Sequence, residues 1–141
     1  MNFTGSQIVR IVSLLGISLL GLGCGQVEYD GLRTVQGTVT LDGQPYPNAL
    51  ITFSPKSGGR PSKGLTDAEG RYELNYIRTT KGAETGEHSV KIMTMPPIHE
   101  GPGMPSMKMP KEVLPARYNQ RSTLESVVEE GPNEIDFELD S

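Results

Sequence analysis

The sequence has no tryptophan, a single cysteine and no excess of basic residues. One cysteine cannot form a disulfide within the chain, so the fold has to be stabilised by its core alone. The formal net charge is −4 and the Lys and Arg residues are scattered, which argues against nucleic acid as a partner, because phosphate binding needs a clustered basic face. Aromatic residues are few, so the predicted core consists mainly of Val, Ile, Leu and Tyr.

Long apolar runs are also missing. The run at residues 11–22 follows the basic residue Arg10 and ends at Gly23 and Cys24. A transmembrane helix needs about 20 apolar residues, and this run is shorter. A basic start, a short apolar run and small residues before a boundary predict a secretory signal. We therefore predict a signal peptide at 1–23, a tether at 24–32 and one domain at 33–141.

The Gly23-Cys24 junction resembles the lipobox of bacterial lipoproteins. That resemblance implies cleavage before Cys24 and a thioether bond from Cys24 to diacylglycerol. It departs from the family pattern at Gly21, where leucine is usual. A lipid on Cys24 implies a domain anchored to a membrane of the cell envelope and facing the periplasm or the exterior. Secretion with a free thiol, or a retained hydrophobic anchor, are the alternatives.

Catalytic motifs are missing as well. The sequence has no Gly-x-Ser-x-Gly, no His-Glu-x-x-His and no spare thiol, so we predict that the protein is not an enzyme. His88 lies at an inward position of an alternating segment, which favours a partly buried histidine bonded to backbone or tyrosine over a ligand or a pH-sensitive group. No second histidine lies at metal-binding spacing, so a zinc site is not expected.

What the sequence has in quantity is Gly and Pro, seventeen and eleven residues, between short apolar runs. This composition predicts a turn-rich β protein. Alternation of apolar and polar residues predicts strands. We expect an all-β fold, an antiparallel β-sandwich of about seven strands at 34–41, 49–54, 64–66, 71–76, 87–95, 124–128 and 133–139. The last two are expected to form a hairpin across residues 129–132, and 96–110 is expected to be a long loop.

Two turns are predicted from their residues. Asp42-Gly43 is a strong signal for a two-residue hairpin turn. Asp67 to Gly70 fits a type I turn in which the Asp side chain accepts backbone hydrogen bonds and the Gly takes positive φ. We expect the second turn to join two antiparallel strands around which the other strands are arranged.

Several segments together resemble a known family. They are residues 35–43, Pro47-Asn48-Ala49, Thr66-Asp67, and Gly70-Arg71-Tyr72 with Leu74. The chain is similar over about residues 33–140 to the carboxypeptidase-regulatory-like domain, a transthyretin-like or Ig-like β-sandwich, as in small lipoproteins of planctomycete bacteria. Further segments of those lipoproteins are matched at Gly82-Ala83, Gly86, His88, Pro115, Tyr118 and Asn119. The resemblance implies a β-sandwich and no catalytic residues.

A cluster of methionines, Met104, Met107 and Met109, lies close in sequence to His99. Thioethers are soft ligands that select Cu(I), so this cluster is a candidate metal site. The alternatives are that the methionines fill an irregular loop or offer a contact patch to a partner protein.

The expected function is therefore that of a membrane-anchored extracytoplasmic lipoprotein. Its β-sandwich is expected to be a non-catalytic binding or structural module for an envelope protein or polysaccharide. The alternative is a Cu(I)-binding envelope protein.

Overall fold

The structure is a computed structural model that describes residues 29–95 and 111–141. Within these ranges it contains β-strands and one short 3-10 helix, η1 (Ala116–Tyr118), and no α-helix. The strands are β1 (Leu32–Arg33), β2 (Val35–Leu41), β3 (Gln44–Pro45), β4 (Ala49–Pro55), β5 (Ser62–Leu65), β6 (Arg71–Glu73), β7 (Asn75–Ile77), β8 (Thr80–Lys81), β9 (Ala83–Glu84), β10 (Gly86–Thr94), β11 (Leu124–Val128), β12 (Asn133–Glu134) and β13 (Phe137–Leu139). The predicted all-β class is confirmed.

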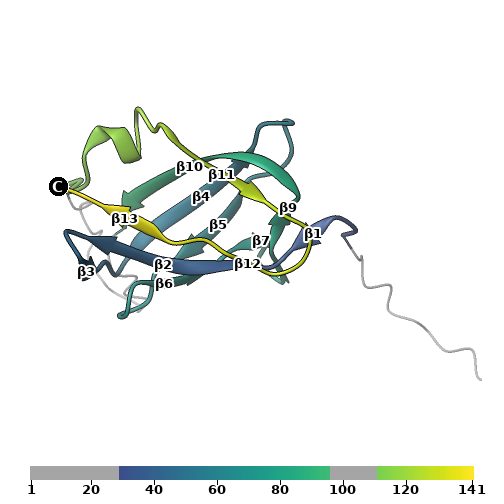
Figure 1. Ribbon diagram of the computed structural model, residues 1–141, viewed down its shortest axis with the longest axis horizontal. Helices are drawn as coiled ribbons and strands as arrows, with labels where there is room; N and C mark the ends of the chain where they lie inside the picture. Colours follow the sequence, from purple (N-terminus) through teal and green to yellow (C-terminus); the bar gives the residue numbers. More distant parts are fainter. Residues whose placement is uncertain (1–28, 96–110) are drawn as a thin grey trace, which may run out of the picture.

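The strands form two layers, consistent with a β-sandwich (Figure 1). One layer is a six-stranded antiparallel sheet in the order β11-β10-β4-β5-β7-β8. The other is built on β2, which pairs antiparallel with β3 and β6 and parallel with β12 and β13. The short pair β1–β9 lies at one end of the molecule, and the C terminus lies at the other end.

More and shorter strands are present than the seven expected. The predicted strand at 71–76 is divided at Leu74, because β6 pairs with β2 while β7 pairs with β5 in the other sheet. The predicted strand at 133–139 is divided at Ile135 and Asp136. Ile135 accepts a hydrogen bond on its carbonyl from the Tyr72 hydroxyl at 2.6 Å. Burial raises the pKa of that hydroxyl.

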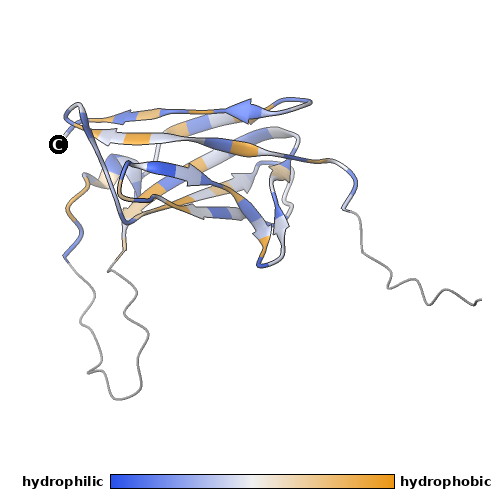
Figure 2. Ribbon diagram, turned by 90° about the horizontal axis from the view of Figure 1, so that it is seen from below, coloured by the Kyte–Doolittle hydropathy of each residue, from blue (hydrophilic) through white to orange (hydrophobic). Residues whose placement is uncertain are grey.

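The core lies between the two sheets and follows the predicted alternation. β2, β4 and β10 each bury every second side chain, and Figure 2 shows the resulting alternation of polar and apolar segments along the strands. The largest fully buried side chains include Phe53, Ile51, Leu74 and Ile92. Each such apolar side chain stabilises the fold by about 1.5–3 kcal/mol relative to an exposed one.

The Asp42-Gly43 turn is confirmed. Both residues have positive φ, 51° and 80°, which is the conformation of a type I′ hairpin turn. The turn joins β2 to β3, with Leu41 opposite Gln44.

The predicted turn from Asp67 to Gly70 is present, although the strands on either side of it are not paired as a hairpin next to the turn. Gly70 has φ 75°, and its N–H donates to the Asp67 carbonyl at 3.0 Å. The Asp67 carboxylate accepts hydrogen bonds from the backbone N–H groups of Arg71 and Glu69, at 2.9 and 3.0 Å. These bonds, above all that from Arg71, hold the pKa of Asp67 below its ordinary value.

The strands beside this turn differ from the prediction. β5 pairs with β4 in the six-stranded sheet, whereas β6 pairs with β2 in the other sheet. The turn therefore connects the two layers, and only Lys63 and Asn75, farther from the turn, are paired across β5 and β7.

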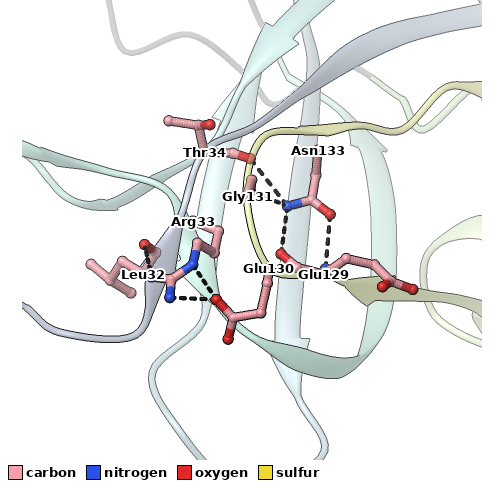
Figure 3. A network of polar contacts seen from close by, with 7 residues as sticks. All are labelled: Leu32, Arg33, Thr34, Glu129, Glu130, Gly131 and Asn133. Atoms are coloured by element: carbon pink, nitrogen blue, oxygen red, sulfur yellow. Dashed lines mark hydrogen bonds and ion pairs between the residues drawn. The ribbon is translucent and has the colours of Figure 1, made fainter.

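The predicted terminal hairpin is wrong. β11 pairs with β10, and β12 and β13 pair with β2, so residues 129–132 cross from one sheet to the other. The side chain of Asn133 stabilises this connection by hydrogen bonds to its backbone (Figure 3). Its Oδ1 accepts from Glu129 N at 2.8 Å, and its Nδ2 donates to the carbonyls of Glu129 and Gly131 at 3.0 Å. Arg33 binds Glu130 beside it.

Candidate binding face

The outer face of the six-stranded sheet carries an apolar row. Met93 on β10, Leu50 on β4 and Leu65 on β5 lie directly opposite one another on three adjacent strands. Met93 is 36% exposed, Leu65 is 43% exposed and Leu50 is half-buried. The solvent face of an antiparallel sheet is usually polar. We call these three residues the apolar row, and it interrupts that pattern.

A lysine row lies next to the apolar row. Lys91, Thr52 and Lys63 are opposite one another on the same three strands, two residues along from the apolar side chains. Both lysines are exposed. In the part of the chain that the structure describes, neither forms an ion pair.

The far end of the same face carries one lysine and two glutamates, so its net charge is negative. Lys56 lies 2.8 Å from the Glu125 carboxylate and 3.7 Å from that of Glu87. The hydrogen bond to Glu125 is the main cause of the raised pKa of Lys56. The uncompensated positive charge of this face is therefore concentrated at the lysine row.

Glu112 fixes the chain at the apolar-row end of β10. Its carboxylate accepts hydrogen bonds from the Thr94 N–H and hydroxyl, the latter at 2.7 Å, and from Leu114 N–H at 3.0 Å. The Tyr46 hydroxyl lies 2.7 Å from that of Thr94, and Met95 N–H donates to the Asn48 carbonyl. Residues 95 and 112 are thereby held close together. Glu112 was not among the candidate residues predicted from the sequence.

His88 is a core residue. It is 1% exposed, and its ring packs against Phe53 at a centroid distance of 5.7 Å. Nδ1 lies 3.0 Å from the Gly86 carbonyl. Because a carbonyl only accepts, Nδ1 carries the proton in this contact. Nε2 is buried without a partner among the described residues. The predicted hydrogen bond to backbone is present, but the side chain is fully buried and not partly buried as predicted.

Two surface pockets are small. One, of about 160 Å³, is lined by Gln36, Gly37, Thr38, Arg71, Tyr72 and Glu134. The other, of about 130 Å³, is lined by Lys56, Glu87, Glu125, Ser126 and Val127. Pockets for small organic ligands usually measure about 300–1,000 Å³. Neither pocket has the size of a typical substrate site, and within residues 29–95 and 111–141 no three His, Cys, Asp or Glu side chains are grouped to hold a metal.

The remaining predicted site residues lie outside the described ranges. They are the lipidation residue Cys24 and the candidate Cu(I) ligands His99, Met104, Met107 and Met109. Lipidation and Cu(I) binding both stay predictions. Across the described residues, the structure has no helix with the length and apolar character needed to cross a membrane.

Comparison with known proteins adds no relative: no family model matches the chain, and no curated protein matches it.

Proposed function

We propose that the protein is a non-catalytic binding module of the cell envelope, held at a membrane by a lipid on Cys24, which uses the apolar row to contact an envelope protein. The row carries this proposal, because it aligns three apolar side chains on adjacent strands of the outward sheet face, whereas the exposed Val127 of the same face lies apart from it on β11. Exposed apolar patches rimmed by polar residues mark interaction sites. Burying the row against a partner removes this apolar surface from water.

The layout of the domain supports a tether at its N-terminal end. β1, which begins at Leu32, the last residue of the predicted tether, lies at the end of the sandwich opposite the C terminus (Figure 1). The apolar row lies near the start of β4 and the end of β10, which is the C-terminal end of the sandwich. A domain anchored through Cys24 therefore carries its contact face at the end farther from the anchor.

The proposal includes relationship to the carboxypeptidase-regulatory-like, transthyretin-like domains. Two features support it: the type I′ turn at Asp42-Gly43, and the turn at Asp67 to Gly70 whose Asp side chain caps the backbone. Both lie at positions that carry the sequence resemblance. A module of this kind contributes a surface and no reacting groups.

Photo-crosslinking tests the contact face. We expect the full chain with p-benzoylphenylalanine in place of Leu65 to form a discrete protein adduct in intact cells. Replacing a neighbour in the row, by Leu50→Asp or Met93→Asp, should lower its yield about tenfold, because a carboxylate in a buried apolar contact is costly. The same probe at exposed Glu138, on the other sheet, is the matched control.

Thermal melting of each variant separates loss of contact from loss of fold. The proposal is contradicted if the probe at Leu65 yields no adduct beyond that of the probe at Glu138. It is also contradicted if the adduct persists unchanged in folded Leu50→Asp and Met93→Asp chains.

A further inference from the structure

The charge beside the apolar row indicates the chemistry of the partner. Lys63 and Lys91 are exposed and carry no ion pair with any described residue, although the chain as a whole has a net charge of −4. We infer that the row and its lysines bind an acidic amphipathic segment of a second protein, whose apolar side chains cover the row and whose carboxylates pair with Lys63 and Lys91. This inference rests on the proposed function and adds the charge and spacing of the partner.

The sheet geometry fixes the spacing that such a segment must meet. Lys91 and Lys63 are separated by one intervening strand, β4. Strands lie about 4.8 Å apart, which places the two backbone positions about 10 Å from each other. The lysine row is two residues from the apolar row, a step of about 7 Å along the strands. The partner therefore presents carboxylates to two lysines whose backbone positions are about 10 Å apart, beside a line of apolar side chains.

A protein fits this face better than an anionic membrane does. Glu87 and Glu125 are exposed on the same sheet face, and their carboxylates would be repelled by anionic headgroups. The apolar row also lies at the end of the sandwich away from β1 (Figure 1). A short segment with two carboxylates needs only the lysine row and leaves Glu87 and Glu125 in their pairs with Lys56.

Charge reversal tests the inference. In the full chain carrying p-benzoylphenylalanine at position 65, the double change Lys63→Glu and Lys91→Glu should lower the adduct yield about tenfold, because attraction becomes repulsion at two positions. Lys63→Arg with Lys91→Arg keeps the charge and should retain the yield. Arg121→Glu, a charge reversal at an exposed position outside the six-stranded sheet, is the matched control and should also retain the yield. Proteolysis of the adduct should release a crosslinked partner peptide with at least two Asp or Glu residues.

Three results would overturn the inference. One is an adduct that survives double charge reversal in a folded chain while still being lost with Leu50→Asp; that result leaves the proposed function standing. Another is an adduct whose mass is that of two copies of this chain. The third is binding of the chain to phosphatidylglycerol vesicles that the double reversal abolishes, which would assign the lysines to a membrane. A probe at Leu65 that yields no adduct at all contradicts the proposed function itself.

Discussion

Replacing Gly70 with valine is expected to lower the free energy of unfolding by about 2–6 kcal/mol, since a strain cost and a steric cost of about 1–3 kcal/mol each add. Gly70 has φ 75°, a conformation that β-branched residues resist. A Cβ at this position would also lie 2.5 Å from the Val39 carbonyl oxygen and 3.0 Å from Tyr46 N. Those two atoms form a hydrogen bond with each other, and Gly70 O accepts from Val39 N at 2.7 Å. The side chain therefore disrupts the docking of the turn on β2.

Urea unfolding of the chain from Gly25 onward measures this effect. Gly43→Val is the matched control, because Gly43 also has positive φ, 80°, but a Cβ there has no atom within 4 Å. The free energy of unfolding of this control should fall only by the cost of backbone strain, about 1–3 kcal/mol. Equal losses in both variants would contradict the docking of the turn, and an unchanged midpoint for Gly70→Val would contradict the turn assignment itself.

Replacing Gly37 with alanine is expected to destabilise the domain by about 3 kcal/mol or more, although only one methyl group is added. The new Cβ would overlap the Ile135 carbonyl oxygen and lie 2.6 Å from its carbonyl carbon. Backbone cannot swing aside as a side chain does. Ile135 is also held by hydrogen bonds from its N–H to the Gln36 carbonyl and from the Tyr72 hydroxyl to its own carbonyl. Strand pairing between β2 and the C-terminal strands must therefore break or shift.

Gly59→Ala is the control for this second variant. A Cβ on Gly59 also meets close atoms, with Glu84 Cδ at 2.7 Å, but these belong to the end of a flexible side chain. The free energy of unfolding of Gly59→Ala should differ from that of the wild type by no more than about 0.5 kcal/mol. If Gly37→Ala unfolds at the same urea concentration as Gly59→Ala, the close approach of the C-terminal strand to β2 is contradicted.

The sequence predicts the elements of this fold better than their partners. Alternation in residues 35–41 and 87–94 identifies strands because it records which side chains are buried, and Asp42-Gly43 identifies a turn because its conformation is local. Alternation carries no record of the neighbouring strand. The terminal hairpin was therefore predicted wrongly. The backbone N–H and the side-chain amide of Asn133 both donate to the Thr34 carbonyl, which is far away in the sequence, and these bonds direct the chain to the second sheet.

The candidate face was missed for a related reason. Leu50, Leu65 and Met93 are apolar residues at outward positions of separate strands, which is a weak signal for each residue taken alone. They become one row only through the register of β10, β4 and β5. The sequence shows each of these as an apolar residue at an outward strand position. Only the register shows that the three lie side by side.

The intact mass of the mature chain, purified from bacterial membranes after expression of the full sequence, tests the membrane tether most directly. We expect a chain that begins at Cys24 and carries a diacylglyceryl group, and a Cys24→Ser chain that lacks this added mass and leaves the membrane fraction. A wild-type chain with no lipid at Cys24, recovered in the soluble fraction, would contradict the lipid anchor.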